Sequence, residues 1–172
     1  MYEQQLDRLI VRISGGDDDA LAELYEKTNR GVFAFLYSYL DNREDSEDAM
    51  QDVYLKVKLH AGSYRHGSNA RAWMLQIAKN IALNELAARA RTVDADLSRM
   101  AARDDGDGEL GITKLMREVL TEEERRIIAL HVLWGYRHRE IAEMTGCPVG
   151  TVTAKYNRSV KKLRRILKET GK

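Results

Sequence analysis

A single segment near the end of the chain, residues 139–168, admits very few folds. Its sequence is REIAEMTGCPVGTVTAKYNRSVKKLRRILK. Two short helices that meet at a wide angle need a small residue where they cross and a glycine at the turn. Ala142 and Gly146 supply these four residues apart. The segment therefore predicts a helix-turn-helix.

The second helix of this motif is apolar on one face and mostly basic elsewhere. Its apolar residues recur at helical spacing: Val152, Tyr156, Val160, Leu163 and Leu167. Its other faces carry hydroxyl, amide and basic side chains: Thr151, Thr153, Lys155, Asn157, Arg158, Lys161, Lys162, Arg164, Arg165 and Lys168. Such a helix suits a DNA major groove flanked by phosphates. A merely solvated helix is the alternative, but it leaves 8 basic residues against 1 acidic residue over 152–172 unexplained.

The net charge of +1 over 172 residues hides an uneven distribution. Residues 1–90 hold 11 Lys/Arg against 14 Asp/Glu, residues 91–112 hold 3 against 6, and residues 113–172 hold 14 against 7. The positive charge is thus confined to the part that contains the helix-turn-helix. Such a division indicates two modules with different partners.

Composition favours an all-α, cytoplasmic protein. Pro148 is the only proline and β-branched runs are few. Cys147 is the only cysteine, so one chain can build neither a disulfide framework nor a cysteine zinc site. No apolar run approaches the roughly 20 residues needed to span a bilayer, and no signal peptide precedes Leu6.

The first ninety residues read as four helices that could form a bundle. A short amphipathic helix with Leu6 and Ile10 ends at Gly15-Gly16, and the acids from Asp17 to Asp19 offer a cap for the next helix. A third helix opens on the acids from Asp45 to Asp48. A glycine-containing loop, 61–69, then leads into a fourth helix from Ala70 to about Arg89, with Trp73 expected in the core.

The helical pattern fails over residues 91–111, which mix acids, small residues and glycines. We expect a flexible linker there, with at most a helical turn at 97–101. Thr121 and Glu124 then form a capping box before an apolar helix that ends at Gly135. The predicted organisation is a helical domain at 1–90, a linker at 91–111 and a helix-turn-helix domain at 112–172.

Two separated segments together resemble one family. Residues 45–86, DSEDAMQDVYLKVKLHAGSYRHGSNARAWMLQIAKNIALNEL, resemble the polymerase-binding and promoter-melting region of bacterial sigma factors. Residues 120–167, LTEEERRIIALHVLWGYRHREIAEMTGCPVGTVTAKYNRSVKKLRRIL, resemble their C-terminal promoter-binding region. Their order and the short linker resemble the extracytoplasmic-function class.

The resemblance assigns a role to the third helix, which binds a coiled coil of the largest polymerase subunits in this family. Its mostly acidic face suits basic partner residues. The face comprises Asp45, Glu47, Asp48, Gln51, Asp52 and Lys56. The alternative is a solvated helix start whose acids only favour the helix dipole.

The loop and the fourth helix resemble the part of the family that captures unstacked bases of the melted minus-ten element. Single strands are held by stacking surfaces and cationic grooves. The loop and helix start offer Tyr64, Arg65, His66, Ser68, Asn69 and Arg71. Farther along, Lys79, Asn80 and Asn84 could hold phosphates or a base edge. A solvent-facing Asn80 without a contact is the alternative.

In the last helix, Thr151, Thr153, Ala154, Lys155 and Arg158 match the family positions that face the minus-thirty-five element. Arg and Lys can read guanine, and Thr and Ala can contact a thymine methyl. Lys161 and Lys162 are expected to touch phosphate or polymerase.

Some positions depart from the family pattern. Thr121 stands where proline is common, Lys58 where tryptophan is frequent, and Ala154 where serine is common. The stretch 86–89 is poorer in arginine than usual, which puts duplex contacts upstream of the melted element in doubt. None of these changes removes a whole functional face.

Neither a catalytic nor a metal site is predicted. His131 and His138 are seven residues apart but have no nearby carboxylates at metal-ligand spacing. No glycine-rich phosphate loop and no strand-turn-helix context for a nucleophile occur. We expect a protein that is not an enzyme and needs no cofactor.

The resemblance implies a sigma factor that directs core RNA polymerase to promoters, binds duplex and single-stranded promoter DNA, and is held by an anti-sigma factor. A stand-alone helix-turn-helix regulator is the first alternative, and it gives the acidic helix no role. A helical adaptor that binds only protein is the second, and it gives Lys155 and Arg158 no role.

Overall fold

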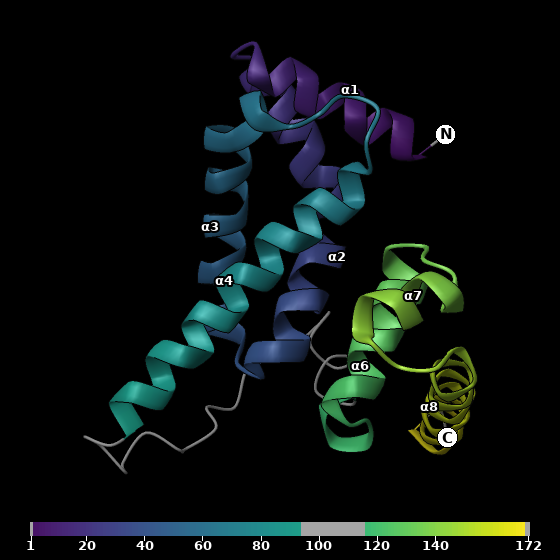
Figure 1. Ribbon diagram of the computed structural model, residues 1–172. Coiled ribbons are helices and arrows are strands. Elements are labelled where there is room, and N and C mark those ends of the chain that lie inside the picture. The colour runs from purple at the N-terminus through teal and green to yellow at the C-terminus, as the bar shows by residue number, and fades with distance from the viewer. Residues whose placement is uncertain (1, 94–115, 171–172) are drawn as a thin grey trace. The chain divides into compact units, whose positions relative to one another are not determined.

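The computed structural model describes residues 2–93 and 116–170. Within these ranges the regular structure is helical and contains no strand, so the all-α prediction is confirmed. The chain divides into two compact units, Met1–Ala102 and Arg103–Lys172 (Figure 1). Most of the predicted linker, including the suggested turn at 97–101, lies outside the described residues.

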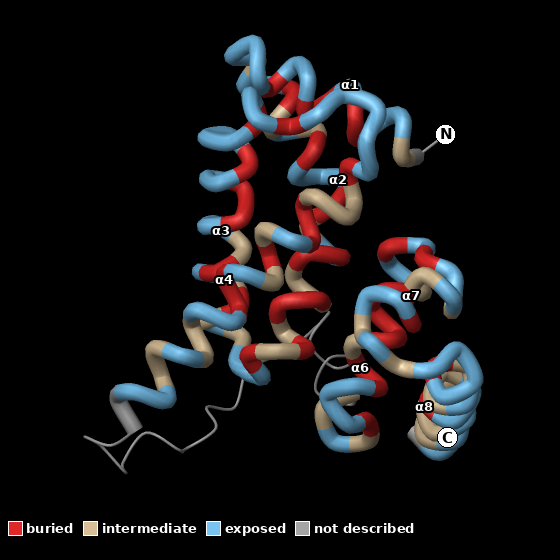
Figure 2. Tube along the Cα trace, viewed as in Figure 1, coloured by how far each residue is buried: buried red, intermediate tan, exposed pale blue. Residues whose placement is uncertain are grey.

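The N-terminal unit is built from four long helices and one short turn: α1 (Tyr2–Ser14), α2 (Asp18–Leu40), α3 (Arg43–His60), η1 (Ala61–Ser63) and α4 (Ala70–Val93). All four helices bury apolar side chains in a common core (Figure 2). Leu6, Leu24, Val53 and Met74 are fully buried and come from one helix each.

Capping residues set where two of these helices begin. Asp17 precedes α2 and accepts a hydrogen bond from the amide of Ala20 at 3.0 Å, as its sequence position predicted. Asn42 caps α3 by accepting from the amide of Asp45 at 3.1 Å. For this reason α3 begins at Arg43, slightly before the acids that the sequence suggested as its start.

The fourth helix differs from the prediction in two respects. It continues to Val93 rather than ending near Arg89, because Arg91 continues the run of good helix formers. Trp73 was expected in the core but is only half-buried. Its ring packs on Tyr64 with the centroids 5.2 Å apart, so Tyr64 takes the inner position.

The C-terminal unit contains α6 (Glu122–Ile128), η2 (Ala129–Leu133), α7 (His138–Thr145) and α8 (Val149–Thr170). The predicted capping box opens α6. The Thr121 hydroxyl accepts from the Glu124 amide at 3.3 Å, and the Glu124 carboxylate accepts from the Thr121 amide at 3.0 Å. The helix then widens into a π-helical turn, η2, which ends shortly before Gly135. Gly135 itself has a φ of 69°.

The helix-turn-helix has the geometry that its sequence predicted. Ala142 is buried where α7 packs on α8. Gly146 ends α7 with a φ of 70°, a conformation in which a glycine meets no steric penalty. On α8, Val152 and Ser159 are fully buried, whereas Leu167 is 53% exposed. The predicted apolar face is therefore wrong at Leu167, where the helix extends beyond the elements that cover it.

Candidate nucleic-acid and protein interfaces

The outer face of α3 presents only part of the acidic set predicted for it. Asp48, Gln51, Asp52 and Lys56 are exposed, and neither Asp48 nor Asp52 makes an ion pair within the described residues. Asp45 and Glu47 are engaged inside the unit. Asp45 pairs with Arg89 of α4, and Glu47 accepts from Arg43 Nε at 2.6 Å.

Two leucines on the same helix were not predicted as part of this face. Leu55 is 56% exposed and Leu59 is 68% exposed. They follow Gln51 at intervals of four residues, so the three side chains form one stripe beside Asp48 and Asp52. The i, i+4 spacing was visible in the sequence. Only the packing shows that this stripe does not join the core.

The loop between η1 and α4 is tied to α1 by a buried carboxylate. Asp7 is 7% exposed, and its Oδ1 accepts from the Tyr64 hydroxyl at 2.7 Å and from the Gly67 amide at 2.8 Å. Its Oδ2 lies 2.6 Å from His66 Nδ1. Burial alone would raise the pKa of Asp7, but the donated hydrogen bonds and the neighbouring imidazole bring it below its usual value.

These contacts alter the roles expected of the predicted loop residues. Tyr64 is 9% exposed, and burial raises its pKa to about 12. Its ring lies in the core, so its position does not support the predicted stacking role. The half-buried ring of Trp73 lies on its outer side. Arg65, His66 and Ser68 remain exposed.

A second acid of α1 holds the start of α4. The carboxylate of Glu3 accepts from Arg71 Nε at 2.6 Å and from the Arg71 amide at 3.3 Å. Asn69 caps α4 by accepting from the Ala72 amide at 2.9 Å. Neither Asp7 nor Glu3 was predicted from the sequence to belong to the site.

On α4, the polar residues predicted to face DNA are accessible. Asn80 and Asn84 are exposed, and Lys79 is half-buried. The carbonyl oxygen of the Asn80 side chain accepts from Gln76 Nε2 at 2.8 Å. The spacing of four residues places Asn80 and Asn84 one turn apart on one side of the helix.

Helix α8, the second helix of the helix-turn-helix, presents a mixed surface. Thr151, Ala154, Arg158 and Lys161 are exposed. Thr153 is half-buried, and its hydroxyl lies 3.1 Å from His138 Nδ1.

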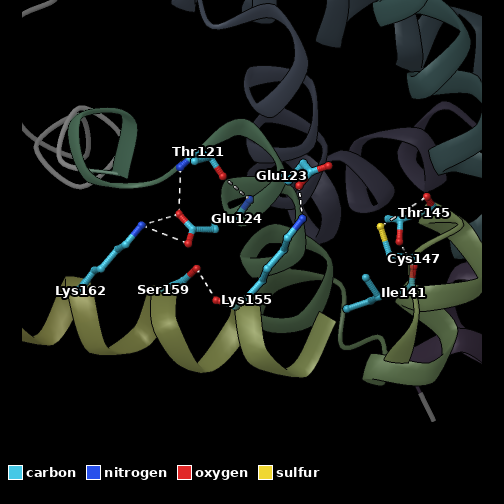
Figure 3. Close-up of polar contacts among 9 residues, drawn as sticks. All are labelled: Thr121, Glu123, Glu124, Ile141, Thr145, Cys147, Lys155, Ser159 and Lys162. Carbon is cyan, nitrogen blue, oxygen red and sulfur yellow. Dashed lines mark hydrogen bonds and ion pairs between the residues drawn. The ribbon is translucent and has the colours of Figure 1, made fainter. Parts of the chain in front are cut away.

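Two lysines of α8 lie against the start of α6 (Figure 3). Lys155 pairs with Glu123. Lys162 Nζ lies 2.8 and 3.1 Å from the two carboxylate oxygens of Glu124. Burial would raise the pKa of Glu124, but the hydrogen bonds from Lys162 and the Thr121 amide lower it. The carboxylate of Glu123 raises the pKa of Lys155.

The two histidines singled out in the sequence do meet. The rings of His131 and His138 have centroids 4.7 Å apart, and Tyr156 packs against both. Burial lowers the pKa of His138. No group of three or more metal-ligating side chains occurs among the described residues, and the cluster joins η2, α7 and α8 by ring packing.

Comparison with known proteins decides the family. Residues 24–92 match the model of sigma-70 region 2, and residues 115–163 match that of sigma-70 region 4. The ECF RNA polymerase sigma-E factor of Haemophilus influenzae is 30% identical over 178 residues, which cover 92% of this chain and 94% of that protein. The chain belongs to the extracytoplasmic-function sigma factors.

Further relatives agree with this assignment. The RNA polymerase sigma-H factor of Pseudomonas aeruginosa is 26% identical, over 92% of both chains. The solved structure of the sigma factor RpoE of Bartonella quintana, in complex with the anti-sigma factor NepR, has a TM-score of 0.67 at 25% identity. That match covers 88% of this chain and 98% of the other.

Family membership fixes the general function. A sigma factor is a non-enzymatic initiation factor that makes core RNA polymerase promoter-specific. Its partners are core RNA polymerase and promoter DNA, and both rival hypotheses from the sequence are set aside. No helix among the described residues is long and apolar enough to cross a membrane.

Proposed function

We propose that three separate surfaces of this sigma factor divide the work of initiation. The outer face of α3 binds polymerase, the loop before α4 holds the melted minus-ten strand, and α8 reads the minus-thirty-five duplex. The observation that carries this division is where polar and charged side chains remain exposed. Asp48, Asp52 and Arg158 all stay outside the internal ion pairs described above.

The polymerase-binding surface of α3 combines charge with apolar contact. Asp48 and Asp52 offer carboxylates to basic partner residues. Leu55 and Leu59 offer apolar surface that binding removes from water. Asp45 pairs with Arg89 of α4 and so holds α3 against that helix, whereas Glu47 pairs with Arg43 within α3 itself.

A charge reversal at one exposed acid tests the polymerase-binding surface. Asp52→Lys should weaken binding to core polymerase at least about tenfold, because a like charge then faces the basic partner. Glu26→Lys is the matched control, since Glu26 is an exposed acid on α2 outside this surface. Equal affinities of the two variants in a core-binding titration would rule out the α3 surface.

The melted strand is held by the loop and the outer side of α4. Arg65, His66 and Ser68 supply charge and hydrogen bonds, and Trp73 supplies the aromatic face that Tyr64 does not present. Asn80 and Asn84 extend this surface along α4.

The upstream duplex is read by the exposed residues of α8. Arg158→Ala should cost about 1–3 kcal/mol of promoter binding and relax base preference at one position of the minus-thirty-five element. Lys168→Ala, an exposed lysine near the end of the same helix, serves as control. Loss of the same size in both variants, without a change of base preference, would show a purely electrostatic role.

We also propose the domain boundaries, the location and a further partner of this protein. The boundaries 1–90, 91–111 and 112–172 separate two DNA-facing domains by a linker, and the protein acts in the cytoplasm beside polymerase. An anti-sigma factor is proposed as a further partner, as in the Bartonella quintana complex with NepR. Co-purification with the polymerase subunits and with such a factor tests these points.

A further inference from the structure

Helix α1 sets the conformation of the loop that we propose to hold the melted strand. This helix lies outside the residues that match sigma-70 region 2. That match begins at residue 24, whereas α1 spans Tyr2–Ser14. Figure 1 shows the segment between α3 and α4 passing along α1 before it enters α4. Carboxylates of α1 accept hydrogen bonds from Tyr64, Gly67 and Arg71 of this segment.

Asp7 is the centre of these contacts. It accepts hydrogen bonds from Tyr64 and Gly67 and pairs with His66, so one carboxylate reaches three of four consecutive residues. Its own exposure is 7%. A buried carboxylate with several donors is costly to disturb, because each lost partner leaves a polar group unsatisfied.

The loop backbone depends on this acceptor. Gly67 has a φ of 77°, and its amide points at Asp7 rather than at water. Glu3 holds the next segment through both the amide and the guanidinium of Arg71. The α1 carboxylates therefore fix the loop at two points that bracket the exposed residues Ser68 and Asn69.

We propose that Asp7, assisted by Glu3, is a positioning residue for promoter recognition: it presets the 64–71 loop in the shape that holds an unstacked minus-ten base. This rests on the proposed role of that loop. Asp7 itself does not touch DNA. It lowers the cost of binding because the loop need not be ordered when the base arrives.

The test uses holoenzyme made from the full chain and core polymerase. The probe is a fork-junction promoter selected from a library randomised over the minus-ten element. Asp7→Asn keeps the size of the side chain but removes its charge. Asp17→Asn is the matched control, because it removes the same charge near the end of α1 and asparagine still caps α2.

The readout is the ratio of affinities for the selected base and for the other three bases at each position. Partial unfolding lowers the active fraction equally for every probe, so it cannot change this ratio. Asp7→Ala removes the oxygen that an asparagine would still offer to Tyr64 and Gly67, and it should lower the ratio at least about fivefold at one position, because a misplaced contact loses most of its discrimination. Asp7→Asn should lower the ratio less, and Asp17→Asn should leave it unchanged. An unchanged ratio in Asp7→Ala would overturn the proposal.

Variants of the loop itself separate this proposal from the one on which it rests. Arg65→Ala removes an exposed loop side chain and should weaken binding of the fork-junction probe. If Arg65→Ala weakens binding and Asp7→Ala keeps its base ratio, the loop binds DNA but α1 does not position it. If Arg65→Ala, His66→Ala and Asn69→Ala all bind normally, the proposed role of the loop fails. Tyr64→Phe, which removes only the hydroxyl, should lower the base ratio less than Asp7→Ala.

Discussion

Each unit holds the segment that we propose to face DNA by acids from a preceding helix, but the two units do so in different surroundings. In the N-terminal unit, buried Asp7 binds a backbone amide, a buried hydroxyl and an imidazole. In the C-terminal unit, Glu123 and Glu124 bind lysines of the recognition helix itself. Glu124 is buried, whereas the side chain of Glu123 is 59% exposed.

In the N-terminal unit the acid fixes the shape of a loop, whereas in the C-terminal unit the acids bind the charged groups of lysines. The Tyr64 hydroxyl and the Gly67 amide that Asp7 binds are uncharged and not needed to neutralise phosphate, so these two contacts can persist when DNA is bound. Lys155 is itself a candidate for DNA contact, so Glu123 and a phosphate or base compete for the same ammonium group. We therefore expect substitutions of Asp7 to weaken promoter capture and substitutions of Glu123 to strengthen it.

The largest effect on stability is expected at Asp7. Asp7→Ala should lower the free energy of unfolding of the N-terminal unit by about 2–4 kcal/mol, since it leaves the Tyr64 hydroxyl and the Gly67 amide without their acceptor. Urea unfolding measures this loss. A loss below about 1 kcal/mol would mean that water replaces the carboxylate and that the anchor is not buried in solution.

Glu124→Ala should cost about 1–2 kcal/mol in the C-terminal unit. It removes half of the capping box and the partner of Lys162. The exposed Glu122→Ala is the control on the same helix turn. Chemical denaturation of the two variants should differ by at least about 1 kcal/mol, and equal stabilities would remove the basis for the second anchor.

High pH should weaken the N-terminal anchor through Tyr64. Its pKa is raised to about 12, so the folded protein favours the neutral phenol. The stabilisation that the neutral phenol gives is complete below pH 10, the ordinary pKa of tyrosine, and is lost as pH rises through 12. At pH 11 the loss should be about 1 kcal/mol. Urea unfolding of wild type and Tyr64→Phe checks this, and wild type alone should lose it.

The smallest effect on stability is expected at Glu123. Glu123→Gln should change stability by less than about 1 kcal/mol, because the ion pair is exposed. It should raise affinity for the minus-thirty-five duplex about two- to fivefold by releasing Lys155. Fluorescence anisotropy with Glu122→Gln as control measures this. Weaker binding of Glu123→Gln would show that the glutamate positions the lysine for DNA instead.

Local patterns in the sequence were sufficient to predict much of the fold. The N-cap at Asp17, the capping box at Thr121 and Glu124, and the crossing at Ala142 and Gly146 depend on residues within a few positions of each other. Such interactions depend little on the rest of the chain, so the spacing of the residues is enough to predict them.

The candidate site was less predictable because its decisive contacts are long-range. Asp7 and Tyr64 are 57 residues apart, and Glu123 and Lys155 are 32 apart. The sequence shows that Tyr64 and Trp73 are two aromatic residues close to the start of a helix, but it does not show which ring is buried. Which ring faces the core depends on the partner that α1 supplies. The exposed Leu55 and Leu59 illustrate the same limit, since apolar residues at helical spacing were not separable from core residues.

The amide of Gly67 reports most directly on whether α1 presets the loop. This residue lies on an exposed loop, where an amide without a partner exchanges its hydrogen with solvent rapidly. Hydrogen exchange of the free protein, followed by NMR at that amide, should show slow exchange in wild type and in Asp17→Asn. The same amide should exchange at least about tenfold faster in Asp7→Ala. Rapid exchange in wild type would contradict a loop that is preset by α1.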